Sequence, residues 1–291
     1  MVELVPRRPL SHRERPLAVT LSLSKGWVAR YTRCRRVGGV TGSEILALYD
    51  AQMRADPAAD VGLVFVRDGS VLRSVGLWNV VTYWRLSAAD VDGAVAEQAA
   101  RARSAGEALE WKVFDHDGPP GIEQALEREG FVADPRETFM VLDLARDEPD
   151  VALGEGVEVR AIVDEGGVGD FVAVSGAAFE RDDLLKGEVY VRSLGDPALT
   201  LYVVYRDGRP VSGGRLQTPA ERSFASIWGG GTVPGERGRG AYRALVAHRV
   251  REARRRGYRY LTVDAADTSR PILERLGFVP LTGITGYVLG P

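Results

Sequence analysis

A run of glycines and arginines in the C-terminal third of the chain carries the clearest chemical signal. Three glycines at 229–231 follow a β-prone run, and Gly238 and Gly240 come shortly after them. Apolar residues then recur at helical spacing from Ala241, and Gly257 stands where such a helix would end in the left-handed conformation. A turn of this kind leaves backbone N–H groups unpaired at the positive end of a helix dipole. The sequence therefore predicts an anion site suited to a phosphate or pyrophosphate.

Two common phosphate-binding loops do not match this turn. No Gly-Lys-Ser/Thr follows it, and the dinucleotide fingerprint would need a third glycine where Arg243 stands. The segment instead resembles the pyrophosphate loop of the GCN5-related N-acetyltransferases (GNAT), Arg/Gln-x-x-Gly-x-Gly/Ala. Arg237 and Gly240 match that signature, whereas Tyr242 departs from it. A Leu-Gly-Phe at 276–278, common at the end of the family's core, follows at the expected separation.

The resemblance implies that the turn binds acetyl-CoA, or another acyl-CoA, as a co-substrate. It further implies an acetyl-CoA-dependent N-acyltransferase whose acceptor is the amine of a small molecule or peptide. A backbone N–H at 231–233 would polarise the thioester carbonyl. The residues that the resemblance assigns to the cofactor are Thr232, Val233, Arg237, Gly238, Arg239, Gly240, Ala241, Tyr242 and Arg243.

The residue that deprotonates the acceptor amine is less plain from the sequence. Many family members place a carboxylate on the strand before the loop, but residues 223–228 contain none. Asp264, at the end of the next predicted strand, is our first choice, and Glu180 and Asp182 are alternatives. Capping of the following helix is the ordinary structural explanation for Asp264.

The family's usual general acid is also replaced. A tyrosine often precedes the Glu of its Tyr-Glu-x-Leu-Gly-Phe run, and here that position is Leu273. Tyr287 is our prediction for the acid that protonates the leaving thiolate, while Tyr242, Ser269 or water could take its place. Because the usual residue is missing, a non-catalytic acyl-CoA-binding or sensor protein is the alternative function.

The chain also repeats itself. Residues 125–132, Ala-Leu-Glu-Arg-Glu-Gly-Phe-Val, match 272–279 at six of eight positions, and the Arg-Asp-Gly at 67–69 returns at 206–208. Echoes in the same order at similar offsets indicate a duplicated domain. We therefore predict an α/β fold with a mixed sheet, built as two tandem GNAT-like domains.

The predicted domains are 43–148 and 149–291, and the first is expected to have lost the cofactor site. Its residues 85–92, which correspond to the glycine turn, contain no glycine, and Asp90 and Asp92 would repel a pyrophosphate. We expect this domain to pack against the second and to wall the acceptor cleft. Its aromatic run, which includes Trp78, would lie in the core, at the domain interface or in an acceptor pocket.

Composition excludes several other classes of protein. The chain has 38 basic and 40 acidic residues, a net charge of −2 and 45% hydrophobic residues, which is ordinary for a soluble globular protein. Nucleic-acid binding is therefore unlikely from overall charge, and no apolar run approaches a membrane span. The three histidines and the single Cys34 are too scattered to predict a metal site. We expect a cytoplasmic enzyme without a metal, and the sequence indicates nothing about its oligomeric state.

Residues 1–42 form a basic leader with nine Lys and Arg against two Glu. They show no sustained helical or strand period, and we expect them to be disordered. There are two alternatives. The segment could be a tail that binds nucleic acid or acidic lipid, or Met1 could lie upstream of the natural start of the protein.

Overall fold

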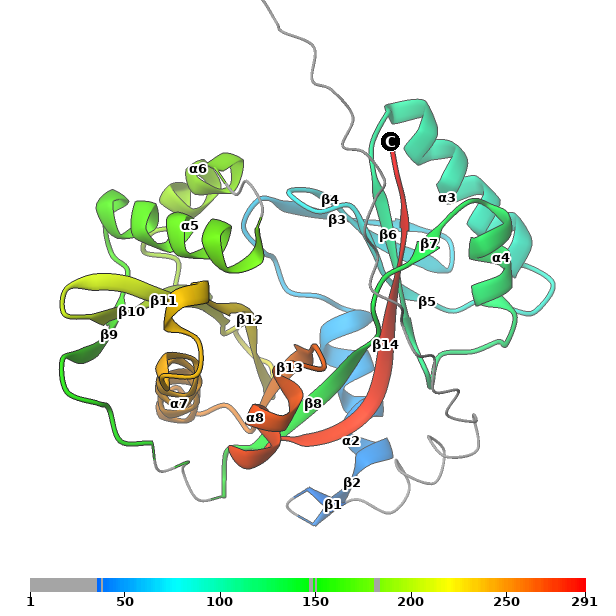
Figure 1. Cartoon of the computed structure of the whole chain (residues 1–291). Coiled ribbons are helices and arrows are strands. Elements are labelled where there is room, and N and C mark those ends of the chain that lie inside the picture. The colour runs from blue at the N-terminus through cyan, green and yellow to red at the C-terminus, as the bar shows by residue number, and fades with distance from the viewer. Residues whose placement is uncertain (1–35, 38, 147–148, 150, 181–183) are drawn as a thin grey trace, which may run out of the picture.

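The computed structural model describes residues 36–37, 39–146, 149, 151–180 and 184–291. Within these residues one twelve-stranded mixed sheet runs through both halves of the chain, in the order β3-β4-β5-β6-β14-β8-β13-β12-β11-β10-β9, with β7 paired to β14 (Figure 1). Its strands are β3 (Leu63–Asp68), β4 (Val71–Gly76), β5 (Val80–Trp84), β6 (Leu109–Phe114), β7 (Val132–Ala133), β8 (Glu137–Asp143), β9 (Val157–Ala161), β10 (Leu199–Arg206), β11 (Arg209–Gln217), β12 (Phe224–Thr232), β13 (Tyr260–Ala265) and β14 (Val279–Leu289).

Helices cover both faces of this sheet. They are α2 (Gly42–Tyr49), the π-helical turn η1 (Asp50–Arg54), α3 (Val91–Ala105), α4 (Ile122–Arg128), α5 (Glu165–Phe179), α6 (Leu184–Arg192), the 3-10 turn η2 (Pro234–Glu236), α7 (Ala241–Arg255) and α8 (Arg270–Arg275). In the second half, α5 and α7 pack on β11 and β12 from opposite faces (Figure 1). No helix in the described ranges is both long and apolar enough to cross a membrane.

The start of the fold contains a capping box. The Thr41 hydroxyl accepts a hydrogen bond from the Glu44 N–H, and the Glu44 carboxylate accepts one from the Thr41 N–H at 2.8 Å. A short hairpin, β1 (Arg36–Val37) and β2 (Val40–Thr41), precedes α2, and Val37 is fully buried. The last residues of the segment assigned to the leader therefore belong to the fold, and residues 1–35 lie outside the described residues.

Residues 70–84, rich in β-branched and aromatic residues, would suit one strand but form two. Residues 70–84 divide into β4 and β5 because Gly76 adopts a φ of +124°, where an added side chain would collide with the carbonyl of Gly62. The Asn79 side chain accepts a hydrogen bond from the Gly76 N–H at 3.1 Å and closes the turn. The break places Trp78 in a loop, outside the ladder, where it can point away from the core.

Both halves place a parallel strand pair at the same point. In the first half β5 pairs with β6 at Val80 and Val81, and in the second half β12 pairs with β13. The other pairings in the described sheet are antiparallel. The mixed sheet and the repeated order of elements confirm the predicted fold class.

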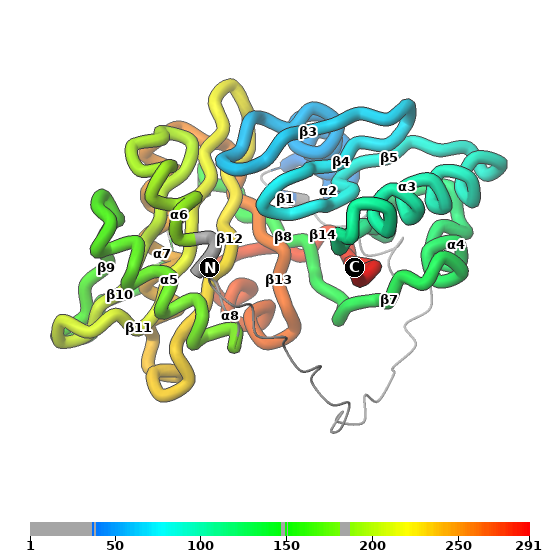
Figure 2. The backbone as a smooth tube through the Cα atoms, turned by 90° about the horizontal axis from the view of Figure 1, so that it is seen from above, coloured from blue at the N-terminus to red at the C-terminus, as the bar shows by residue number. Residues whose placement is uncertain are grey.

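The two halves also exchange their last strands. β8, from the first half, lies between β13 and the start of β14, and the end of β14, at the C-terminus, pairs with β6 (Figure 1). Figure 2 shows the β3–β4 hairpin reaching across toward α6 and β12 of the second half. The boundary between 148 and 149 stays a prediction, because the hydrogen-bonded sheet is continuous across both halves.

Candidate active site

The two parallel strands of the second half separate after a short stretch of pairing. The register of β12 and β13 covers only Phe224–Ser226 against Tyr260–Thr262. Beyond Ser226 the strands diverge, and β12 continues to the glycine turn. A wedge between parallel strands, with a helix N-terminus at its edge, can hold an extended ligand that ends in a phosphate.

The helix that follows the turn begins as the sequence predicts. Gly240 is the N-cap of α7 at φ 90°, ψ −8°, and Gly238 also has a positive φ, so both positions favour glycine. No side chain caps the helix, and its first turn holds no carboxylate. The first N–H groups of α7 are therefore unblocked by acidic side chains, and Gly257 has a positive φ as expected.

The arginines of the turn have different surroundings. Arg237 donates to the Thr232 carbonyl at 3.2 Å and to the Ala178 carbonyl at 3.0 Å, which ties the turn to α5. Arg239 pairs with Glu236 at 2.8 Å. Arg243 is exposed, and its guanidinium lies 3.5 Å from the point where a Gly240 side chain would begin. Of the three, Arg243 is best placed to meet a phosphate without losing a contact.

A β-bulge interrupts β12 at its glycines. Gly213 pairs with Gly231 and Arg215 with Trp228, so Gly229 and Gly230 face only Gly214 across the ladder. The extra residue of a bulge is left without a ladder partner. The expected oxyanion donor at 231–233 fits less well, because the Val233 N–H donates to the Val211 carbonyl at 3.0 Å. The bulge at Gly229 and Gly230 is the better source of a free N–H.

A cavity of about 1160 Å³ opens from this wedge and extends over the sheet between the two halves. The second half contributes its wedge strands and α5, and the first half contributes β3 to β6 and the α2–η1 segment. Most lining side chains on the strands lie on one face of the continuous sheet. The predicted role of the first half, walling the cleft, agrees with this position.

Charged groups of both halves, Lys112, Asp264 and Glu137, meet on the sheet face that lines the cavity, which we call the cavity floor. Lys112 on β6 donates to Asp264 on β13 at 2.9 Å. Burial disfavours the Lys112 ammonium, but the Asp264 carboxylate outweighs this and raises the pKa of Lys112. Glu137, at the start of β8, lines the same floor, and burial together with the Asp264 charge raises the pKa of Glu137. This floor can hold a cationic or neutral amine and accept a proton from it.

The structure separates the predicted catalytic residues. Asp264 lines the cavity, but Tyr287 packs into the core of the first half, opposite Trp111, and does not line it. Burial raises the pKa of Tyr287 to about 12. Glu180 ends α5 at a positive φ and is exposed, and Asp182 lies outside the described residues.

Tyr242 and Ser269, the other candidates for the acid, do meet at the cavity. Tyr242 hydrogen-bonds Ser269, and its ring lies against Gly230 of the bulge. Burial raises the pKa of Tyr242, so its hydroxyl keeps its proton. Leu273, which replaces the family's usual tyrosine, is fully buried.

The sequence did not indicate Glu137 and Lys112 as site residues. Neither belongs to a motif, and both come from the half expected to lack the cofactor site. Glu137 approaches Asp264 only because β8 is exchanged into the second half of the sheet. A local sequence pattern carries no signal of such a pairing.

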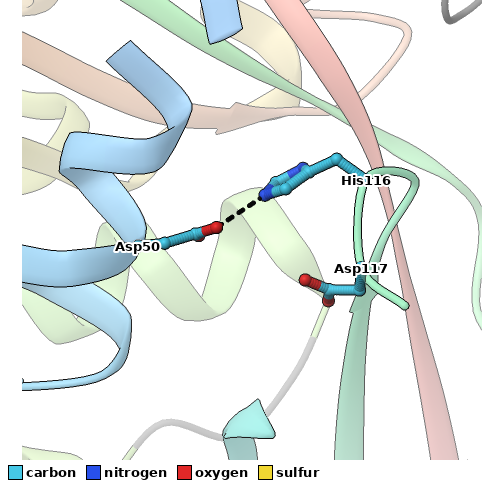
Figure 3. A group of neighbouring side chains, drawn as sticks. All are labelled: Asp50, His116 and Asp117. Atoms are coloured by element: carbon cyan, nitrogen blue, oxygen red, sulfur yellow. Dashed lines mark hydrogen bonds and ion pairs between the residues drawn. The ribbon is translucent and has the colours of Figure 1, made fainter. Parts of the chain in front are cut away.

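Asp50, His116 and Asp117 form a second charged group, around the cavity-lining Arg54 (Figure 3). One potential metal-ligand atom from each lies within 4.8 Å of the others, although the sequence predicted no metal site. Arg54, which is buried, bonds Asp50 and Asp117 at 2.8 Å each, and His116 bonds Asp50 at 2.9 Å. Since Arg54 already pairs with both carboxylates, we interpret the group as an ion-pair network that fixes η1 against the loop after β6.

The first-half counterpart of the glycine turn differs as expected. α3 begins after Asp90, whose carboxylate accepts a hydrogen bond from the Ser87 hydroxyl at 2.5 Å. Asp92 lies in the first turn and pairs with Arg128. Two carboxylates thus occupy the helix start that a phosphate would need.

Comparison with known proteins gives a family match for part of the chain. The family model described as Acetyltransferase (GNAT) family matches residues 172–278, which include α7 and most of the wedge. A search of curated proteins finds no match.

Solved structures share the architecture over most of the chain. A GCN5-related N-acetyltransferase from Kribbella flavida has a TM-score of 0.62 at 17% identity, and the match covers 85% of this chain and 93% of that one. A tandem GNAT protein from the clavulanic acid biosynthesis pathway has a TM-score of 0.58 at 16% identity, over 95% and 98% of the two chains. The GCN5-related N-acetyltransferase from Sphaerobacter thermophilus has a TM-score of 0.54 at 15% identity, over 90% and 91%.

These likenesses extend beyond the region of the family model and include a protein with two GNAT units in one chain. Residues 172–278 therefore match the GNAT family model, and the chain as a whole has the fold of tandem GNAT proteins.

Proposed function

We propose that this protein transfers an acetyl group from acetyl-CoA to the amine of a small acceptor. The observation that carries the proposal is the wedge between β12 and β13, which joins an uncapped helix N-terminus at one end to the cavity floor at the other. The pyrophosphate of the donor would bind at Gly238–Gly240 and Arg243, and its thioester would reach the bulge. Each task of acyl transfer then has a group in the described residues.

The acceptor amine attacks the thioester carbon, and the negative charge gathers on the carbonyl oxygen. A free N–H of Gly229 or Gly230 is positioned to stabilise that charge. The C–N bond forms as the C–S bond breaks, and the leaving sulfur takes a proton from Tyr242 or from a water held by Ser269. The amine gives up its proton to a carboxylate.

Glu137 suits that last role better than Asp264. Asp264 is nearly buried and accepts a hydrogen bond from Lys112, so protonating it would break an ion pair. Glu137 has a raised pKa and no such partner among the described residues. A base whose pKa lies nearer to the working pH accepts a proton more readily. Asp264 and Lys112 would instead position the acceptor.

The test is the pH profile of kcat/KM, measured as release of CoA thiol with a panel of amines. The parent should lose activity at acidic pH as Glu137 is protonated. Glu137→Gln should lower kcat by about a hundredfold or more and remove that acidic limb. Glu110→Gln, a matched change in the same cavity, should keep the limb. If Glu137→Gln keeps it as well, Glu137 is not the base.

A further inference from the structure

Arg215 occupies an unusual place in the cavity. It lies on β11 directly across the ladder from Trp228, and its guanidinium stands 5.9 Å from the centre of that ring. The ring centre of Trp78, from the first half, lies 4.7 Å from the same guanidinium. Trp228 is itself fixed, because its indole N–H donates to the side-chain amide oxygen Oε1 of Gln217 at 3.1 Å. Two aromatic rings therefore hold the Arg215 guanidinium in one orientation.

Three other cations of the cavity wall are already paired with carboxylates. Arg54 bonds two carboxylates, Lys112 pairs with Asp264, and Arg136 pairs with Asp115. Arg249 is fully buried and donates to backbone carbonyls through Nε and Nη1, whereas its Nη2 has no hydrogen-bond partner among the described residues. Arg215 alone among them is half-buried, lines the cavity and lies within ion-pairing distance of no carboxylate in the described ranges. Its charge is available to a ligand.

The free charge and the proposed amine site both lie near the Trp228 ring. Lys112 Nζ is 5.3 Å from the centre of the Trp228 ring, and Arg215 is 5.9 Å from the same centre. The two cations are thus no farther apart than the sum of these distances, about 11 Å. Asp264 lies 2.9 Å from Lys112, so an anion site and a carboxylate floor face the same small space.

We propose that the acceptor is an amino acid or a short peptide, held by its carboxylate at Arg215 while its amine faces Asp264 and Glu137. An arginine binds a carboxylate through two parallel hydrogen bonds, which sets the direction of the ligand as well as its affinity. The apolar rings of Trp78 and Trp228 would flank the acceptor's backbone. This inference rests on the proposed acyl transfer in one respect only, namely that the amine is the group that reacts.

The experiment compares each acceptor with its own carboxamide. The probes are the natural L-amino acids and simple dipeptides, each as the free acid and as the C-terminal amide. Binding is measured by calorimetry in the presence of acetyl-CoA, and kcat/KM is measured where transfer occurs. The proteins are the parent, Arg215→Met, Arg215→Lys, and Arg209→Met, which changes an exposed arginine on the same strand.

In the parent at least one acid should bind about tenfold or more tightly than its amide. Arg215→Met should bring that ratio close to one, Arg215→Lys should leave an intermediate ratio, and Arg209→Met should keep the parent's ratio. A parent that binds no acid better than its amide overturns the inference, as does a preference that survives in Arg215→Met. If Arg215 only joins the two halves, Arg215→Met lowers the melting temperature and leaves the ratio unchanged.

Failure of the proposed function gives a different result. In that case no probe is acetylated, whereas the acid-to-amide ratio in calorimetry still reports on Arg215.

Discussion

Gly240 and Gly121 offer a matched pair for testing where the cofactor binds. Gly240 is the N-cap of α7 at φ 90°, ψ −8°, and Gly121 is the N-cap of α4 at φ 105°, ψ −8°. Replacing either by aspartate puts a side chain in the same left-handed conformation and a carboxylate at the same end of a helix. Only Gly240→Asp puts that carboxylate where the pyrophosphate would bind.

The expected magnitudes follow from this symmetry. Each substitution should cost about 1–2 kcal/mol in left-handed strain, reduced in both by about 0.3–1 kcal/mol from the helix dipole. Acetyl-CoA at a hundredfold excess over its Kd adds about 2.7 kcal/mol of stability. That corresponds to a rise in Tm of about 5–10 °C at roughly 2–4 °C per kcal/mol. A hundredfold loss of affinity leaves about 0.4 kcal/mol, or about 1 °C.

Thermal unfolding with and without acetyl-CoA measures these shifts. The parent and Gly121→Asp should show the full rise, and Gly240→Asp should show almost none, although both variants start from a similar lowered Tm. Equal rises in the two variants would refute the placement of the donor at this turn. No rise in the parent at saturating acetyl-CoA would mean that the domain binds no such donor.

Three further predictions concern the charged groups of the cavity. Lys112→Met should lower the free energy of unfolding in urea by about 3–5 kcal/mol, because it leaves the buried Asp264 carboxylate unpaired. Adding Asp264→Asn should restore part of that loss. Full additivity of the two substitutions in a double-mutant cycle would contradict the pairing. The folded state raises the pKa of Glu137, so ionising this group destabilises the fold above its folded pKa. Glu137→Gln should therefore raise the free energy of unfolding at pH 7 and leave it unchanged in acid. A lower free energy of unfolding at pH 7 would argue against the raised pKa of Glu137. Arg54→Met should likewise lower the free energy of unfolding by about 3–5 kcal/mol. Adding Zn²⁺ to the parent should leave its Tm unchanged. A rise in Tm with the metal would show that Asp50, His116 and Asp117 bind a metal ion instead.

The local parts of this site could be predicted from the sequence. The positive φ at Gly240, the helix from Ala241 and the capping box at Thr41 follow from rules that involve neighbouring residues only. The mixed sheet and the tandem fold followed from the repeat and the resemblance. These predictions held because each element's type is set within a short window of the chain.

The acceptor side of the site could not be predicted in the same way. Glu137 lies beside Asp264, and Lys112 bonds it, only after β8 and β14 are exchanged between the halves. Strand exchange depends on pairing between residues more than a hundred positions apart, and both strands are apolar enough to suit either half. Trp78 reaches Arg215 because Gly76 breaks a strand that alternation alone extends to Trp84.

The most direct test of the central claim is the mass spectrum of a mixture of the protein, acetyl-CoA and the amine panel. Our account predicts an acetylated amine and an equal amount of free CoA, both formed with the parent and, at acetyl-CoA near the parent's Kd, formed far more slowly with Gly240→Asp. Acetyl-CoA that binds, raises Tm and yet stays intact with every amine would contradict the account, and the wedge would then be the site of a binding protein.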